Sequence, residues 1–345
     1  MGLHPTGSVW LRRCLCGAHL HAAVRLDAAA GLDRDTPEVA RGTARGGRCR
    51  GGHGERSRVV RDQPSKLESL LVHLALLTVV AFALYPVLWV IAQAFSGEQT
   101  PDPRLLPLPE QPTLDHLREV VGSTQKTPDG EQWLFGRQLF NSLVISSATA
   151  IVGVAIAIPV AYALARFEFI GKDGSMRALL ATQMFPAVAS AVPLYLLLDA
   201  LNLLNSRTGL VLCYASTSVP FAIFQLRAAF ESIPVDLEEA AMVDGATRGE
   251  AFLRVVLPAA RPAIAVTGLF AFMSAYNEFI LAATLLGREE MFTLPVVLQR
   301  YVGEHDANWP AFAAGALVVS IPVMALFYLV QRHLVAGLTA GAVKG

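Results

Sequence analysis

Charged residues are scarce in this chain of 345 residues: they make up 16% of it, whereas soluble domains carry about a quarter. The deficit is concentrated in long runs. No Asp, Glu, Lys or Arg occurs within 69–97, 138–165 or 307–331, nor within the shorter stretches 178–198 and 208–226. Buried helices of a large soluble protein would be shorter and would alternate with polar faces, so this class of protein is not expected.

Runs of this length fit helices that cross a bilayer, whose core needs about 20 apolar residues per helix. A sixth run, 262–287, carries Glu278 as its single charge. The pattern predicts an all-α polytopic membrane protein with six transmembrane helices. Their expected positions are 69–95, 139–165, 177–201, 208–230, 261–286 and 309–333.

Lys and Arg predict the orientation, because cytoplasmic loops carry an excess of both. Basic residues lie before the first span, after the second, after the fourth and after the sixth, whereas the loops after the first and fifth spans are mainly acidic. Both termini are therefore expected in the cytoplasm, as is the loop 231–260.

The first 62 residues differ in composition from the rest, with eleven Arg, ten Gly and no Lys. Two interpretations stay open: a disordered basic tail, or a segment that is not translated because synthesis starts near Val59 or Val60. Three of the four cysteines lie here. The spacing of Cys14, Cys16 and the two following histidines is too tight for a zinc site, so no metal is expected.

The loop between the fourth and fifth spans is longer than a simple connection requires. Residues 238–258 read EEAAMVDGATRGEAFLRVVLP. Pro234 is suited to begin a helix, and its acidic first turn suits the positive end of the helix dipole. Gly245 predicts a left-handed turn, followed by a second helix to about Leu257. The small side chains of Ala240 and Ala241 allow another protein to approach closely, although an ordinary capped loop is the alternative.

Seven spaced residues of this loop match a motif written EAA---G---------I-LP: Glu239, Ala240, Ala241, Gly245, Val255, Leu257 and Pro258. The motif is typical of inner-membrane permeases of bacterial binding-protein-dependent ABC importers, and Val255 replaces the usual Ile. The stretches 141–167, 182–198, 275–282 and 335–345 resemble the carbohydrate-uptake subgroup, and within it the six-span permeases for maltose and maltodextrin. The resemblance covers about 65–345.

The resemblance implies a transmembrane permease domain over 63–345 and a cytoplasmic coupling helix that sits in a cleft of an ATPase subunit. The expected ATPase-coupling residues are Glu239, Ala240, Ala241, Asp244, Gly245, Leu257 and Pro258. By the same resemblance, the tail 340–345 also contacts the ATPase.

The chain lacks a nucleotide site of its own. Gly171-Lys172 resembles the end of a phosphate-binding loop, but the required glycine before it is missing. We therefore expect no catalytic residue and no cofactor, with ATP bound by a separate subunit. The resemblance implies a second permease, two cytoplasmic ATPase subunits and an extracytoplasmic sugar-binding protein as partners in a bacterial inner membrane. Membrane lipid is a further partner and nucleic acid is not one.

Glu278 is a candidate for the translocation path, because a charge within a span is costly unless it is paired or hydrated. Tyr276 and Asn277 are expected to line the path with it, and a structural bond to another span is the alternative. The outer loop 288–308 carries aromatic residues that either contact the binding protein or lie at the lipid headgroups.

Two other classes of protein fit this sequence less well. An autonomous secondary transporter typically has paired intramembrane charges and internal repeats, whereas this chain has one intramembrane acid and no clear repeat. A membrane-embedded enzyme would need a cluster of His, Asp or Glu at one depth, and the spans offer little beyond His73 and Glu278. The substrate expected from the resemblance is maltose or maltodextrin, with another oligosaccharide as the alternative.

Overall fold

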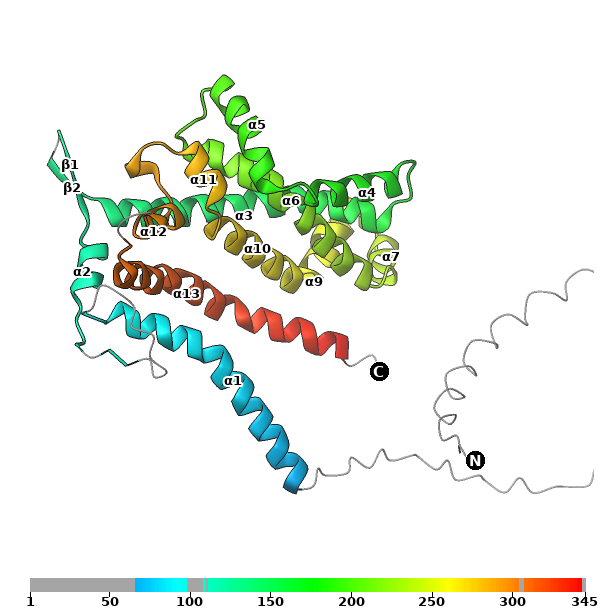
Figure 1. Cartoon of the computed structure of the whole chain (residues 1–345). Helices are drawn as coiled ribbons and strands as arrows, with labels where there is room; N and C mark the ends of the chain where they lie inside the picture. The colour runs from blue at the N-terminus through cyan, green and yellow to red at the C-terminus, as the bar shows by residue number, and fades with distance from the viewer. Residues whose placement is uncertain (1–65, 98–107, 110, 129, 304–306, 343–345) are drawn as a thin grey trace, which may run out of the picture. The chain divides into compact units, whose positions relative to one another are not determined.

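The computed structural model describes most of the chain after residue 65 (Figure 1). The described ranges are 66–97, 108–109, 111–128, 130–303 and 307–342, with the backbone alone described for 332–342. Both interpretations of the N-terminal segment 1–62 concern residues outside these ranges. The same holds for the side chains of the tail 340–345.

Four helices of the described chain are long and apolar enough to cross a membrane. They are α1 (Lys66–Ala94), α3 (Leu134–Arg166), α6 (Arg207–Ser232) and the stretch Trp309–Gln331 of α13 (Trp309–Ala342). These helices lie on the first, second, fourth and sixth predicted spans. If each of two strongly bent helix pairs counts as one span, the total rises to six.

The third predicted span, 177–201, is divided in the structure. The structure has two helices here, α4 (Lys172–Gln183) and α5 (Ala187–Ala200), bent by 99° relative to each other. Pro186 precedes α5 and has no N–H to donate, so a helix running through it would lose a backbone hydrogen bond.

The fifth predicted span, 261–286, is interrupted in the structure. Helix α10 (Arg261–Tyr276) ends before Asn277, and α11 (Ile280–Leu285) begins three residues later. The Met273 carbonyl accepts from both the backbone N–H and the side-chain amide of Asn277, at 3.1 and 2.9 Å. The last turn of α10 is therefore closed by Asn277 itself.

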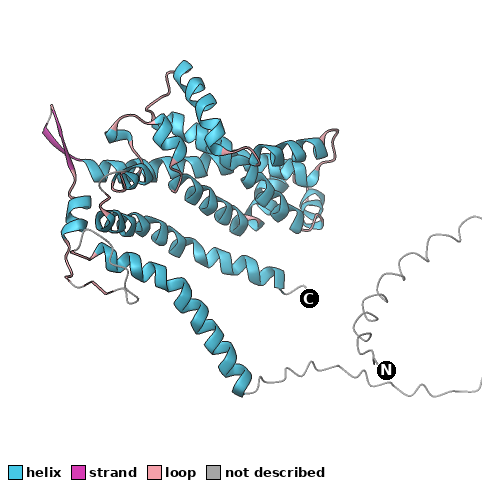
Figure 2. Cartoon of the chain, viewed as in Figure 1, coloured by secondary structure: helices cyan, strands magenta, loops and turns pink. Residues whose placement is uncertain are grey.

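The loop after α1 contains helix α2 (Asp115–Val121) and a short hairpin of β1 (Thr124–Thr127) and β2 (Gly130–Trp133), which is magenta in Figure 2. The two strands are antiparallel, with Thr124 opposite Trp133. Apart from this hairpin and two isolated bridges, the regular structure of the described chain is helical. The loop after α11 holds a 3-10 turn, η2 (Glu289–Met291), and helix α12 (Leu294–Arg300).

Helix α3 is the centre of the packing, in contact with both α6 and α10. Gly153, Ala157 and Ala161 are buried at intervals of four residues, a spacing that places small side chains on one helix face and lets another helix come close. A Cβ atom on Gly153 would lie 3.3 Å from the Ser218 Oγ of α6. Helix α13 packs on α10 and α1, and most of α1 is uncovered in the described chain.

Candidate functional site

The loop between α6 and α10 folds as a helix–turn–helix, here called the coupling segment (236–259). It comprises α7 (Asp236–Val243), α8 (Arg248–Ala251), one π-helical turn η1 (Phe252–Val256) and α9 (Leu257–Ala259). The part from α8 to α9 is a helical unit that bends by 71° into α10. The predicted pair of helices is therefore present.

The turn after α7 has the geometry that its sequence predicts. Gly245 has a φ of +94°, in the left-handed region that glycine adopts without a steric penalty. The Gly245 N–H donates to the Met242 carbonyl at 3.1 Å, and the Ala246 N–H donates to the Ala241 carbonyl at 3.0 Å. This pair of bonds is a Schellman motif, which satisfies carbonyls left unpaired at the end of α7.

The second helix begins at a capping box. The Thr247 hydroxyl accepts from the Glu250 N–H, and the Glu250 carboxylate accepts from the Thr247 N–H at 2.9 Å. These bonds to Thr247, with a smaller effect of Arg254, lower the pKa of Glu250. The sequence signal was available as a Thr followed three residues later by Glu, but it was not among the features singled out from the sequence.

The π-helical turn lies directly before Pro258. Proline has no N–H and its ring clashes with the carbonyl four residues earlier, which here belongs to Arg254. The π-helical turn over Phe252–Val256 already lacks regular α-helical hydrogen bonds. Pro258 therefore disrupts the helix at a point where those bonds are absent. The segment therefore reaches its bend at Ala260 without a break in the helical path.

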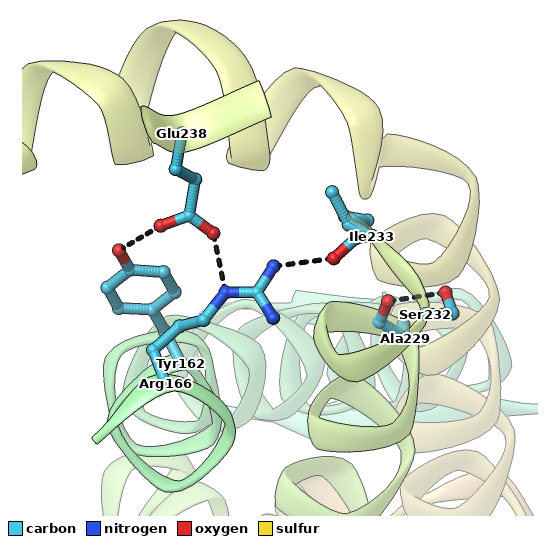
Figure 3. A network of polar contacts seen from close by, with 6 residues as sticks. All are labelled: Tyr162, Arg166, Ala229, Ser232, Ile233 and Glu238. Carbon is cyan, nitrogen blue, oxygen red and sulfur yellow. Dashed lines mark hydrogen bonds and ion pairs between the residues drawn. The ribbon is translucent and has the colours of Figure 1, made fainter. Parts of the chain in front are cut away.

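A buried ion pair attaches α7 to the end of α3 (Figure 3). The Arg166 Nε donates to one carboxylate oxygen of Glu238 at 2.5 Å, and the Tyr162 hydroxyl donates to the other at 2.7 Å. A second guanidinium nitrogen of Arg166 donates to the Ile233 carbonyl at 2.8 Å. The side chains of Arg166 and Glu238 are only 9% and 6% exposed. Arg166 therefore connects α3 to both the end of α6 and the start of α7.

Aromatic contacts surround this ion pair. The Tyr162 ring lies 4.4 Å from the Phe252 ring of η1 and 6.0 Å from the Phe230 ring of α6, measured between centroids. The Arg248 guanidinium lies over the Phe167 ring at 5.2 Å, a distance that suits a cation–π contact. Both helices of the coupling segment are thus packed on the same end of α3.

The opposite face of the segment is exposed. Glu239, Ala240, Asp244 and Gly245 are among its exposed residues, whereas Ala241 of the predicted set is half-buried. Leu257 and Pro258 are also half-buried, near the bend.

Three apolar side chains that the sequence analysis did not single out are also exposed on the coupling segment. The exposed fractions are 86% for Val243, 60% for Leu253 and 48% for Leu237. Exposed acids beside uncovered apolar groups favour a protein partner. A helical wheel of α7 separates its two faces. The buried Glu238 and the half-buried Ala241 and Met242 lie three and four residues apart and so share one face, which leaves the other face exposed.

The predicted path residues do not converge on one point. The Tyr276 hydroxyl donates to the Val319 carbonyl at 2.9 Å, and its ring stacks on Phe272 in the core. The Glu278 carboxylate accepts from the N–H groups of Leu281 and Ala282 at the start of α11. The charge of Glu278 thus satisfies free backbone donors of α11, and its role in a path stays a prediction.

A polar network holds the loop that follows α11. The Asn141 side-chain amide donates to the carbonyls of Glu290 and Phe292 at 2.8 and 3.2 Å, and its oxygen accepts from the Arg207 Nε at 2.9 Å. The neighbouring Ser142 hydroxyl accepts from the Leu294 N–H at 2.7 Å. The α3 end opposite Arg166 therefore fixes η2 and the start of α12.

Among the described residues, no group of three or more His, Cys, Asp or Glu side chains is placed to hold a metal ion. The coupling segment carries exposed carboxylates, small residues and uncovered aliphatic groups on a frame that the Arg166–Glu238 pair attaches to α3.

A family model described as the inner membrane component of binding-protein-dependent transport systems matches residues 135–340. The trehalose transport permease SugB of Mycobacterium tuberculosis (strain CDC 1551 / Oshkosh) is 37% identical, over 77% of this chain and 94% of its own length. The maltose/maltodextrin permease MalG of Vibrio parahaemolyticus serotype O3:K6 (strain RIMD 2210633) is 35% identical, over 83% and 99%. A bacterial ABC transporter that imports alginate includes a chain with a TM-score of 0.62 and 26% identity, over 78% of this chain and 98% of that one.

The chain belongs to the family of binding-protein-dependent transport system inner membrane components. It is a multi-pass permease subunit of an ABC importer and not the enzyme of that complex. The family that the motif at residues 239–258 indicated is therefore confirmed.

Proposed function

We propose that this chain forms half of the transport path of an ATP-driven sugar importer and receives the movement of a separate ATPase through the coupling segment. The observation that carries this proposal is the orientation of α7. Its Glu238 is buried against α3, while Glu239 and Val243 are uncovered on the other side. A helix held from one face and exposed on the other is suited to transmit a force between two proteins.

The contact surface matches what a protein cleft requires. Ala240 and Gly245 present little bulk, so a cleft wall can approach the backbone. The carboxylates of Glu239 and Asp244 are suited to pair with Arg or Lys of an ATPase subunit. Burial of Val243, now 86% exposed, would add an apolar contact at the centre of the surface.

The connections of α7 allow its movement to reach other helices. The chain joins it to α6 before and to α10 after, and Arg166 joins it to α3. A displacement of the coupling segment therefore acts on three helices that pack together. In this proposal, closure of two ATPase subunits tilts these helices and alternates the access of the path.

The proposed partners are a second permease, two ATPase subunits on the cytoplasmic side and an extracytoplasmic sugar-binding protein. With this orientation, both chain termini and the coupling segment face the cytoplasm. The outer loop fixed by Asn141 then faces the binding protein.

The proposed substrate is a neutral oligosaccharide, with maltose or maltodextrin first. Support comes from 35% identity to a maltose/maltodextrin permease over nearly its whole length. Trehalose is the alternative, because a trehalose permease has a comparable identity of 37%.

The proposal is tested by purifying the tagged chain in mild detergent with its co-expressed neighbours and reconstituting the complex in liposomes. We expect an ATPase and a second permease to co-purify, and uptake of maltose or trehalose to require both ATP and the binding protein. Uptake by the isolated chain without ATP would contradict the proposal. A Glu239→Lys variant provides the matched control, since it is expected to stay in the membrane and to lose the ATPase.

A further inference from the structure

A cavity of about 970 Å³ lies at the break between α4 and α5, where both helices face α6. Its volume is within the range of small-molecule sites. The cavity-lining residues include five uncharged polar side chains and one aromatic ring: Thr182, Gln183, Ser190, Ser216, Thr217 and Phe185. Among the described residues, no Asp, Glu, Lys, Arg or His contributes to the lining.

Ser216 and Thr217 lie in the middle third of α6, roughly 14 Å along its axis from Arg207 at 1.5 Å per residue. Both side chains are exposed in the described chain. Polar residues within spans usually face a bundle interior or water. Their position therefore favours a surface that faces the transport path.

The hydrogen bonds of these two cavity-lining hydroxyls use their protons and leave their oxygen atoms able to accept. Each donates its proton to a carbonyl three residues earlier in the helix, Ser216 to Cys213 at 2.7 Å and Thr217 to Tyr214 at 2.9 Å. A hydroxyl oxygen retains its lone pairs after donating. The Gln183 amide donates to the Thr217 carbonyl at 3.1 Å, which holds the end of α4 against α6.

This combination of groups selects a class of ligand. Sugars offer many hydroxyl donors at their edges and apolar C–H groups on their ring faces. Hydroxyl and amide oxygens suit the edges, and the Phe185 ring, 62% exposed, suits a face. An ionic substrate would find no counter-charge on this wall and would lose hydration without compensation.

We propose that this cavity is a contact site for a neutral oligosaccharide in the transport path, contributed by this subunit itself. The inference rests on the proposed function as a sugar permease. It adds that this chain recognises the sugar directly, through Ser216, Thr217 and Phe185.

The test uses the complete importer in liposomes, with maltose and trehalose as probes. Thr217→Val and Ser216→Ala remove one hydroxyl each. The matched control is Ser218→Ala on the same helix, whose hydroxyl donates to the Ala215 carbonyl and lies near Gly153 of α3. We expect kcat/KM for uptake to fall by about three- to tenfold in the two cavity variants and to stay unchanged in the control, as for loss of one or two hydrogen bonds.

A labelling experiment keeps the proposal testable if a variant assembles poorly. Ser216→Cys and Ser218→Cys are placed in a chain without the four native cysteines, and a polar thiol reagent is added. Slower labelling at position 216, but not at 218, in the presence of transported sugar supports the site. The site is overturned if Thr217→Val takes up sugar at the unaltered rate and sugar does not slow the labelling of position 216. It is also overturned if the second permease alone blocks labelling at position 216. If the unaltered importer takes up no neutral sugar, the proposed function itself fails.

Discussion

Arg166 and Glu238 are 72 positions apart in the sequence and form a buried ion pair between the end of α3 and the first turn of α7. The pair is more than a local contact, because Arg166 also binds the Ile233 carbonyl and Glu238 also accepts from Tyr162. With four groups satisfied together, α7 has one position relative to α3. The coupling segment is thus anchored by the residue next to the motif, while the Glu239 of the motif is left exposed.

Removal of Glu238 tests this anchor. Glu238→Ala leaves the buried guanidinium of Arg166 without its anion, and we expect a loss of about 3–5 kcal/mol in the free energy of unfolding. Thermal unfolding of the purified protein in detergent measures the effect. Glu239→Ala is the matched control at the adjacent exposed position, with an expected change within about 0.5 kcal/mol.

A double variant separates lost pairing from lost packing. Replacing both Arg166 and Glu238 by Leu removes the two charges together, so no buried charge remains unpaired. We expect this protein to be more stable than the Glu238→Ala protein. If the double variant loses as much free energy of unfolding as the Glu238→Ala protein, or more, the ion pair does not account for the anchoring of α7.

Gly245→Ala tests the left-handed turn. An added Cβ at this position meets no atom within 4 Å, so the expected cost of about 1–2 kcal/mol comes from the backbone conformation alone. Gly249→Ala is the matched control, since its Cβ also meets open space but its place in α8 favours Ala by up to about 1 kcal/mol. Equal shifts of the unfolding temperature in the Gly245→Ala and Gly249→Ala proteins would contradict a left-handed turn at Gly245.

The capping box predicts a pH dependence of α8. The pKa of Glu250 is lowered in the folded protein, so its contribution to stability is fully present above the ordinary pKa of a glutamate and is lost as the pH falls through the folded value. Amide hydrogen exchange over 248–256 is expected to quicken, relative to intrinsic rates, at acidic pH. Thr247→Ala should cost about 1 kcal/mol and flatten this profile, whereas Thr247→Ser should retain it.

Asn141→Leu tests whether α3 fixes the loop that follows α11. The carbonyls of Glu290 and Phe292 and the guanidinium of Arg207 lose their shared partner, and an unsatisfied buried group costs about 1–3 kcal/mol. We expect faster hydrogen exchange over 289–294. Ser142→Ala removes one bond to the same loop and should have a smaller effect. An unchanged exchange rate in both variants would exclude this network as the support of the loop.

Local signals in the sequence were sufficient for much of the fold. Uncharged runs predicted α1, α3, α6 and α13, and Gly245 with its flanking residues predicted the turn after α7. These features depend on side chains close together in the chain, so a single sequence contains the required information.

The break at Asn277 was missed because long apolar composition conceals short interruptions, whereas Pro186 already indicates an interruption of its helix. The role of Glu238 was missed for a different reason. Glu238 and Glu239 are chemically identical neighbours, and only the position of Arg166 at the end of α3 decides which one is buried. A contact between residues 72 positions apart has no signature in local periodicity.

The central claim is that the uncovered face of α7 docks on an ATPase. Val243→Cys places a thiol at its most exposed apolar position, and a short bifunctional cross-linker is added to the assembled importer. Trp133→Cys at the other end of α3, about 50 Å away along a helix of 33 residues, is the exposed control. The account predicts a cross-link from position 243 to an ATPase subunit, with none from position 133. Assembly of an active importer in which position 243 cross-links to no ATPase would contradict it.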